Sequence, residues 1–213
     1  MARNLDSVCQ MCRREGIKLY LKGSRCESPK CAIERRDSPP GMHTRRGKLS
    51  EYGVRLREKQ KLKHFYGVLE KQFRRYFELA SRSPENTGEA LISILERRLD
   101  NVTHRLGFAP SRASARQLVA HGHVLVNGRF CDIPSMLLKA GDKVAVKNRD
   151  HSQKLVKLNQ QMHTPPIPDF LEITGAEPAE GRVIRLPSRT DIDPRLTQNA
   201  ELKEQLIIEF CSR

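Results

Sequence analysis

Residues 98–128 read RLDNVTHRLGFAPSRASARQLVAHGHVLVNG, and this stretch decides the fold of the chain. The spacing of its apolar residues predicts the end of one helix, a short turn, a second helix from Ser111 to about Gly122, and the first strand of a hairpin. Asn127-Gly128 is the strongest short-range signal for a two-residue hairpin turn. A small unit with arginines at its helix ends beside a tight hairpin is suited to binding a folded phosphate backbone.

Basic and polar side chains around this unit are the candidate RNA contacts. On the second helix they lie off the apolar stripe of Ala115, Leu118 and Val119, so we expect them to face a partner. Guanidinium groups bind phosphate in a bidentate manner, and Asn and His side chains reach 2′-hydroxyl groups. The candidates are Arg98, Arg105, Ser111, Arg112, Arg116, Gln117, His121, His123, Asn127 and Arg129. For any single arginine a solvated helix face explains the pattern about as well, and Asp100 offers Arg98 and Arg105 an alternative partner.

The charge balance predicts an acidic partner. The 213 residues hold 39 Lys and Arg against 25 Asp and Glu, a formal net charge of +14, and only 38% of them are apolar. Nucleic acid is the commonest partner of so basic a protein. The excess is uneven, since residues 1–80 hold 20 cations against 9 carboxylates and residues 151–213 hold 8 against 9. The near-neutral carboxy-terminal part is therefore expected to face protein.

Four cysteines near the amino terminus form two close pairs, Cys9-x2-Cys12 and Cys26-x4-Cys31. Two short loops that each present two sulfurs suit a tetrahedral metal site, and this segment has too few apolar residues for a core of its own. The Ser28-Pro29 pair predicts the start of a short helix, whose dipole would favour the thiolate of the last cysteine. Four unrelated thiols and a redox switch are the alternatives. We expect structural zinc, with an iron–sulfur cluster as the other cofactor that takes four thiolates.

Further helices are predicted on either side of Ser83-Pro84, which interrupts the helical pattern. Two helical segments are predicted before it: an apolar stripe from Leu69 to Ala80, and an earlier helix from Ser50, an expected N-cap, to about Phe65, which carries cations at every fourth position. These cations, Arg55, Lys59 and Lys63, line one side and complete the set of candidate RNA contacts. Beyond the interruption, one continuous helix is predicted from Thr87 to Leu106. The carboxy-terminal elements are expected to be paired strands at 170–173 and 183–186, a short helix at 201–206 and a closing strand at 207–211.

Several motifs of the chain, taken in order, resemble landmarks of a known domain. RLDN at 98–101, SRASARQLV at 111–119, HGHVLVNG at 121–128 and LLKAGDKV at 137–144 are similar to the S-four RNA-binding domain. The opening 26 residues, the run EYGVRLREKQKLKHFYG at 51–67 and the ending EQLIIEFCSR at 204–213 resemble the bacterial small-subunit ribosomal protein S-four family. The similarity runs through the whole chain and is weakest at 152–187.

The resemblance implies a fold, a function and partners. The implied fold is α+β, with a metal-binding segment at 1–46 and a discontinuous helical domain at 47–97 and 163–213, into which an S-four domain at 98–162 is inserted. The implied function is architectural and not enzymatic: a cytoplasmic protein of the ribosome that binds the five-prime domain of small-subunit ribosomal RNA early in assembly. Its implied partners are ribosomal proteins S five and S twelve, with messenger RNA where it enters the ribosome as a further one. An influence on decoding accuracy is also implied.

Two other classes of protein compete with this interpretation. S-four domains also occur on pseudouridine synthases and tyrosyl-tRNA synthetases, but only 63 residues follow Asp150, too few for a catalytic domain. A zinc-dependent DNA regulator needs a helix that reads the major groove and usually a dimer, whereas the helix from Ser111 ends in a hairpin. The chain also lacks a phosphate-binding GxxxxGK[ST] loop, a GxSxG elbow and paired carboxylates on one clear face.

The amino terminus predicts neither secretion nor membrane insertion. Arg3, Asp6, Arg13 and Arg14 interrupt any apolar run there, and no stretch of the chain reaches the length of a membrane span. We therefore expect a cytosolic protein without a membrane partner, in which thiols stay reduced and clustered cysteines favour metal over disulfide.

Overall fold

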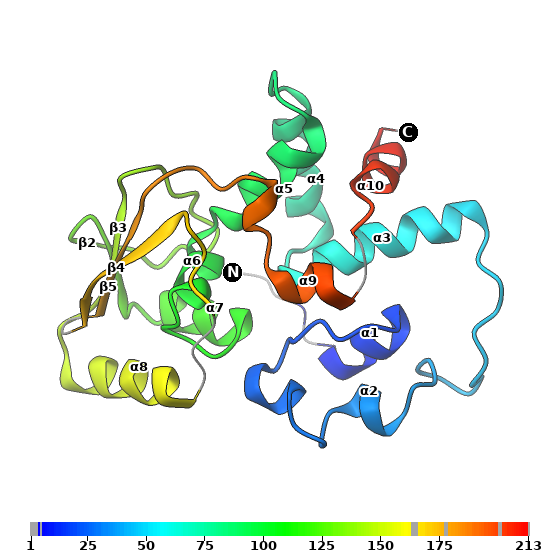
Figure 1. The fold of residues 1–213 in the computed structure, drawn as a ribbon, viewed down its shortest axis with the longest axis horizontal. Helices are drawn as coiled ribbons and strands as arrows, with labels where there is room; N and C mark the ends of the chain where they lie inside the picture. Colours follow the sequence, from blue (N-terminus) through cyan, green and yellow to red (C-terminus); the bar gives the residue numbers. More distant parts are fainter. Residues whose placement is uncertain (1–3, 5, 163–165, 177–178, 200–201, 213) are drawn as a thin grey trace. The chain divides into compact units, whose positions relative to one another are not determined.

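The computed structural model describes residues 4, 6–162, 166–176, 179–199 and 202–212. The chain divides into two compact units (Figure 1). Met1–Leu91 and Ile192–Arg213 form one, called the discontinuous unit below, and Ile92–Asp191 form the other, called the inserted unit. The chain passes from the first to the second within α5 (Thr87–Glu96). No described helix combines the length and apolar character needed to cross a membrane.

The discontinuous unit is helical in its described residues. Besides the start of α5, its elements are α1 (Val8–Glu15), the 3-10 turn η1 (Gly23–Cys26), α2 (Ala32–Arg35), α3 (Glu51–Phe65), α4 (Glu70–Ser81), α9 (Pro194–Asn199) and α10 (Glu204–Cys211). The Ser50 hydroxyl accepts a hydrogen bond from the backbone N–H of Gly53 at 3.2 Å, which confirms the predicted N-cap of α3. Apolar residues of α3 and α4, among them Phe65 and Phe73, are fully buried.

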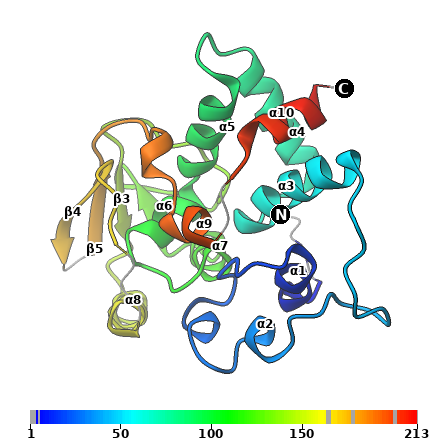
Figure 2. The same ribbon diagram turned by 45° about the vertical axis from the view of Figure 1, so that its right-hand side comes forward.

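Helix α10 packs against α3 although the two are far apart in the sequence (Figures 1 and 2). The rings of Tyr52 and Phe210 lie 5.3 Å apart, and the Lys59 ammonium lies 4.5 Å from the centroid of the Phe210 ring. The predicted strand at 207–211 is therefore wrong, because this segment is helical. As a helix it buries Ile207, which is 1% exposed, and turns its polar residues outward. Of the helix predicted at 201–206, residue 201 lies outside the described residues and the observed helix begins at Glu204.

The segment that contains the four paired cysteines consists of short elements joined by loops. Helix α1 packs against α2 and α3, and the Arg13 guanidinium donates to the carbonyl oxygens of Ser38 and Pro39 at 2.9 and 3.1 Å. The predicted start of a helix at Ser28-Pro29 is wrong. Residues 28–30 form a turn. Helix α2 begins at Ala32, three residues after the predicted first helical residue Pro29, and Cys31 is its N-cap residue.

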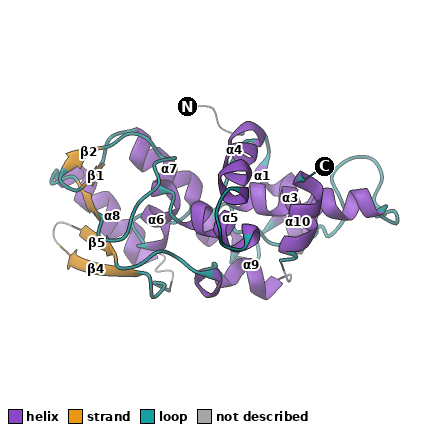
Figure 3. Cartoon of the chain, turned by 90° about the horizontal axis from the view of Figure 1, so that it is seen from above, coloured by secondary structure: helices purple, strands orange, loops and turns teal. Residues whose placement is uncertain are grey.

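The inserted unit combines helices with one antiparallel sheet (Figure 3). Its helices are the end of α5, α6 (Leu99–Arg105), α7 (Arg112–Ala120) and α8 (Asp150–Met162), with a 3-10 turn η2 (Arg189–Asp191). Its strands are β1 (Val124–Val126), β2 (Arg129–Phe130), β3 (Lys143–Val146), β4 (Leu171–Ala176) and β5 (Ala179–Val183), in the order β2-β1-β3-β5-β4. The mixed α+β class is confirmed.

Alternation along the strands places the core on one face of the sheet. Val124 and Val126 of β1 and Val144 and Val146 of β3 are buried, and apolar residues of α6, α7 and α8 complete the same cluster. The hairpin that joins β1 to β2 turns at Asn127 and Gly128, whose φ angles are 51° and 75°. Positive φ at both central residues is what the predicted two-residue turn requires, so that prediction is confirmed.

The continuous helix predicted from Thr87 to Leu106 is wrong, because the chain breaks between α5 and α6. There the backbone bonds to a loop much later in the sequence instead of continuing the helix. The N–H of Leu99 donates to the carbonyl of Met136 at 2.9 Å, and the N–H of Leu138 donates to the carbonyl of Arg97 at 2.9 Å. These long-range bonds satisfy backbone groups that a helix would otherwise pair locally.

The observed division of the chain differs from the predicted one at the carboxy-terminal side. The prediction assigned all of residues 163–213 to the discontinuous domain. However, β4 and β5 extend the sheet beyond β3, with Val144 opposite Gly181, so the inserted unit runs to Asp191. The predicted pairing of strands near 170 and 183 is confirmed in kind, with Leu171 opposite Val183, although the second strand ends where it was predicted to begin.

Candidate nucleic-acid interface

Helix α6 carries buried charged residues that hold the inserted unit together. The guanidinium of Arg98, which is 1% exposed, donates to both carboxylate oxygens of Asp100 at 3.0 and 2.5 Å. Buried charges of this kind are tolerated only when they are paired and hydrogen-bonded. The two residues lie where the chain bends between α5 and α6, so this pair stabilises the bend.

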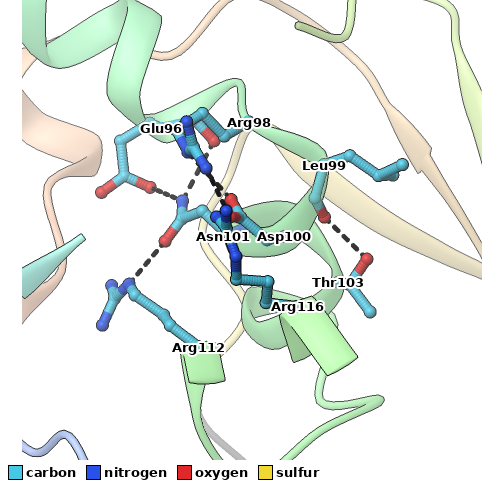
Figure 4. Close-up of polar contacts among 8 residues, drawn as sticks. All are labelled: Glu96, Arg98, Leu99, Asp100, Asn101, Thr103, Arg112 and Arg116. Atoms are coloured by element: carbon cyan, nitrogen blue, oxygen red, sulfur yellow. Dashed lines mark hydrogen bonds and ion pairs between the residues drawn. The ribbon is translucent and has the colours of Figure 1, made fainter. Parts of the chain in front are cut away.

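The same buried groups contact the arginines of α7 (Figure 4). The Arg116 guanidinium donates to Asp100 at 3.2 Å, and that of Arg112 donates to the side-chain oxygen of Asn101 at 2.8 Å. The amide nitrogen of Asn101 in turn donates to the carboxylate of Glu96 at 2.6 Å. Arg112 and Arg116 were predicted to project freely from α7, and the structure instead anchors both to α6. They are brought together in defined orientations on neighbouring turns of one helix.

Arg98 and Arg105 do not lie at the surface, which corrects their prediction as RNA contacts. Arg105 is 3% exposed, donates to the backbone carbonyl of Asp191 at 2.8 Å and lies 3.9 Å from the Glu96 carboxylate. Each guanidinium is covered because a buried carboxylate beside it compensates its charge. Their role is to support the fold beneath the interface.

The remaining α7 candidates have different roles. The hydroxyl of Ser111 accepts a hydrogen bond from the N–H of Ser114 at 3.2 Å, which makes Ser111 the N-cap of α7 and confirms that prediction. Its buried hydroxyl is therefore occupied by the helix and is not placed to contact RNA. Gln117 and His121 are exposed, as a contact to a partner requires.

His123 and Asn127 are partly engaged inside the protein. The Nδ1 atom of His123 lies 2.9 Å from the Ser152 hydroxyl. Burial, with the nearby positive charges, lowers the pKa of His123 below its usual value, so its ring is neutral at physiological pH. The Asn127 side chain donates to Asp142 at 2.9 Å and accepts from the N–H of Lys143 at 2.9 Å, which braces the hairpin. Arg129, beside it, is exposed.

Two further cations lie near this end of the domain and were missed in the sequence. Lys147 and Arg149 follow β3, and both are close enough to His123 to influence its pKa. The backbone N–H of Lys147 donates to the carbonyl of His123 at 2.8 Å, so the two segments are adjacent. The run Lys147-Asn148-Arg149 directly after a strand is the signal that could have identified them.

The three candidates on α3 are paired with carboxylates of the discontinuous unit. Arg55 donates to Glu209 at 2.7 Å, while Lys59 and Lys63 donate to the two oxygens of Glu70 at 2.6 and 3.1 Å. Burial opposes ionisation of Glu70, but these hydrogen bonds prevail and lower its pKa to about 2. Lys59 is buried, so it is not the surface contact that was predicted. More exposed cations of this unit lie on both sides of α3, among them Arg14, Lys22, Arg25, Lys30, Arg35, Arg36, Arg45 and Lys48 before it and Lys71, Arg75 and Arg82 after it.

The four paired cysteines, Cys9, Cys12, Cys26 and Cys31, line one cavity of about 20 Å³. Burial raises the pKa of Cys12 to about 11, with smaller contributions from the other three thiols, and burial likewise raises the pKa of Cys26. The donor set and the convergence of the four side chains suit a thiolate-binding metal. However, no three His, Cys, Asp or Glu side chains in the described part of the chain are grouped so that they could hold a metal ion. The metal site therefore stays a prediction.

The fold and the α6–α7 contacts define an S-four-type RNA-binding domain carried by a second, helical unit. Residues 97–144 match the family described as S4 domain, and residues 3–96 match the family described as ribosomal protein S4/S9 N-terminal domain. Over its whole length the chain is 53% identical to small ribosomal subunit protein uS4A of Alkaliphilus metalliredigens and to small ribosomal subunit protein uS4 of Halothermothrix orenii, both also matched over their whole length. The protein uS4 of Pelotomaculum thermopropionicum is similar to the same degree.

The chain therefore belongs to the family of small ribosomal subunit protein uS4. This confirms the resemblance on which the sequence interpretation rested. The family is one of ribosomal proteins and not of enzymes, which excludes the RNA-modifying enzymes and synthetases that share only the S-four domain.

Proposed function

We propose that this protein is a structural component of the small ribosomal subunit in the cytoplasm and binds small-subunit ribosomal RNA. The observation that carries the proposal is identity of 53% over the whole chain to proteins named small ribosomal subunit protein uS4. The net charge of +14 supports it, because so basic a chain needs an acidic partner to neutralise it.

The arginines of α7 are the proposed centre of RNA binding. Arg112 and Arg116 are held from behind by Asn101 and Asp100, so little side-chain entropy is lost when they contact phosphate. Lys147, Arg149 and the cations of residues 14–48 add attraction without base specificity. Recognition by shape and backbone suits folded RNA, in which the major groove is too narrow for side chains to read.

Comparison of polyanions tests this proposal. Full-length protein is titrated with a folded fragment of the five-prime domain of small-subunit ribosomal RNA, and with duplex DNA of equal length and charge. We expect tighter binding to the folded RNA at every salt concentration, and co-sedimentation of the endogenous protein with small subunits. Equal affinity for both polymers, or absence from purified subunits, would contradict the proposed function.

We further propose the partners that the resemblance implies. These are the five-prime domain of the ribosomal RNA, bound early in assembly, ribosomal proteins S five and S twelve, and messenger RNA where it enters the ribosome. The near-neutral balance of residues 151–213 supports protein contacts for that part of the chain. Chemical crosslinking of intact subunits tests the partners, since crosslinks from this part to RNA alone would contradict them. An effect on decoding accuracy is tested by misreading of a reporter after Lys203→Glu, an exposed position.

We also propose a structural zinc ion bound by Cys9, Cys12, Cys26 and Cys31, with an iron–sulfur cluster as the alternative cofactor. The convergence of the four thiols on one small cavity supports it. Zinc would hold together a segment with few buried apolar residues, so its binding free energy would contribute to folding. Elemental analysis of protein purified without chelators should find one zinc per chain, and Cys12→Ser with Cys26→Ser should abolish it and expose residues 1–46 to protease. Protein that is folded and protease-resistant there without metal would contradict the proposal.

A further inference from the structure

Phe130 is a large apolar side chain on the outer face of the sheet. It lies on β2, which is an edge strand, and it pairs with Leu125 of β1. Because Val124 and Val126 on either side of Leu125 face the core, Leu125 and Phe130 belong to the opposite face. Phe130 is 58% exposed. The protein therefore presents this ring to its surroundings and does not use it in the core.

The Phe130 ring rests on a rigid support. Gly122, which ends α7 with a φ angle of 76°, lies directly beneath it. A Cβ atom at Gly122 would come within 2.5 Å of the ring atom Cε2, so only glycine allows so close an approach. One side of the ring is thus fixed against the backbone while most of the residue's surface stays open.

A cation lies beside this exposed ring. The Lys147 ammonium lies 5.8 Å from the ring centroid. A second cation, Arg149, follows two residues later, and its backbone N–H donates to the Lys147 carbonyl at 2.8 Å. Further along the sheet the charge is balanced, because the Lys143 ammonium lies 3.7 Å from the Glu180 carboxylate. The apolar ring and the unbalanced charge therefore coincide at one end of the sheet.

We propose that Phe130 is a stacking platform for an unpaired base of the bound RNA, with Lys147 contacting a phosphate next to that nucleotide. An unpaired nucleotide combines an apolar π-face with an anionic backbone, and the site offers the matching pair of surfaces. This inference rests on the proposed function, because it assumes that the inserted unit binds RNA. It adds a base contact to an interface otherwise built from phosphate contacts.

The test compares full-length variants in binding to the folded ribosomal RNA fragment. Phe130→Leu keeps an apolar side chain but removes the aromatic face, and we expect it to weaken binding about 5- to 150-fold with an unchanged salt dependence. Phe130→Trp should restore binding to within about twofold of the wild type, because it restores the stacking surface. Lys147→Gln should reduce the slope of log affinity against log salt by about one. Ile133→Ala is the matched control, since Ile133 is a similarly exposed apolar residue at 51%, and it should bind normally.

The outcomes separate this inference from the proposed function. Wild-type protein that does not bind the RNA overturns the proposed function itself. If the wild type binds and Phe130→Leu binds equally well, the stacking platform alone is overturned. The same holds if Phe130→Leu binds RNA normally but is poorly incorporated into subunits, because the ring would then contact a protein partner. Ultraviolet crosslinking of the wild-type complex needs no variant to fold. A nucleotide adduct on the peptide that contains Phe130 supports the platform. Adducts that are found only on other peptides overturn it.

Discussion

Helices α3 and α7 both carry cations one turn apart, yet the two helices use them differently. On α3, Arg55, Lys59 and Lys63 are paired with carboxylates of neighbouring helices. On α7, Arg112 is oriented by the neutral amide of Asn101, and Arg116 shares Asp100 with Arg98. The partners described on α3 are carboxylates, whereas one of the two described on α7 is a neutral amide, which accepts a hydrogen bond without adding a negative charge. Equal spacing in the sequence thus leads to cations that join helices of the discontinuous unit on α3, and to guanidinium groups held in place by α6 on α7.

The largest effect should follow from removing the carboxylate at the centre of the α6–α7 contacts. Asp100→Ala takes the negative charge away from Arg98, whose guanidinium is buried. Breaking a buried pair by removing one partner costs about 3–5 kcal/mol, so we expect the free energy of unfolding of the inserted unit to fall by that amount. Urea denaturation measures the loss, with Asp132→Ala at an exposed position as the control. A loss no greater than that of the control would mean that α6 does not depend on this pair.

A smaller effect is expected from the corresponding carboxylate of the α3 set. Glu70→Gln removes the charge between Lys59 and Lys63, but the Glu70 side chain is 36% exposed and therefore screened by solvent. We expect a loss of about 1–2 kcal/mol in the free energy of unfolding. Glu78→Gln on the exposed face of α4 is the control.

The same carboxylate predicts a pH dependence of stability. The pKa of Glu70 is lowered from its ordinary 4.5 to about 2 in the folded protein, because the two lysines favour its charged form despite its partial burial. Its stabilising contribution is therefore complete above about pH 4.5 and is lost as the pH falls towards 2. Titration of the Glu70 carboxyl by nuclear magnetic resonance should show the low pKa, and Lys59→Met should raise it. An ordinary value in the wild type would show that α3 does not hold its cations in this way.

The smallest changes, and the most direct comparison of the two helices, concern RNA binding. Arg112→Ala and Arg116→Ala should each reduce the slope of log affinity against log salt by about one, because each removes one phosphate contact. Arg55→Ala on α3 should leave the slope unchanged, since its guanidinium is engaged by Glu51 and Glu209. If the α3 and α7 variants reduced the salt slope equally, the two helices would not differ in RNA binding, and their cations would act as one diffuse charged surface.

Local signals in the sequence predicted the elements whose structure is determined locally. The N-caps Ser50 and Ser111 and the hairpin turn at Asn127-Gly128 occur where they were predicted, because each depends on residues within one turn. The apolar stripe of α7 was also predicted correctly, since helical spacing brings Ala115 and Leu118 to one buried face.

Features that depend on distant residues were not predictable in this way. The break between α5 and α6 depends on hydrogen bonds to residues 134–138, and no sequence signal near Arg97 predicts those bonds. The run Leu206-Ile207-Ile208 favours a strand by local propensity, but packing on α3 makes it a helix. Arg98 was predicted as an RNA contact with Asp100 as an alternative partner, and the sequence alone did not decide between the two; in the structure its guanidinium is buried and paired with Asp100.

The pairing of α3 with α10 determines the order in which the two units can fold during synthesis of the chain. Arg55 and Glu209, which join the two helices, are separated by 154 residues. Ribosomes add about 5–20 residues per second, so α3 waits about 8–30 s after its own synthesis before α10 exists to cover it. The strands described in the inserted unit are made within that interval, because the last of them, β5, ends at Val183. The inserted unit can therefore finish folding first. The discontinuous unit completes its packing only after α10 has been synthesised and can pair with α3.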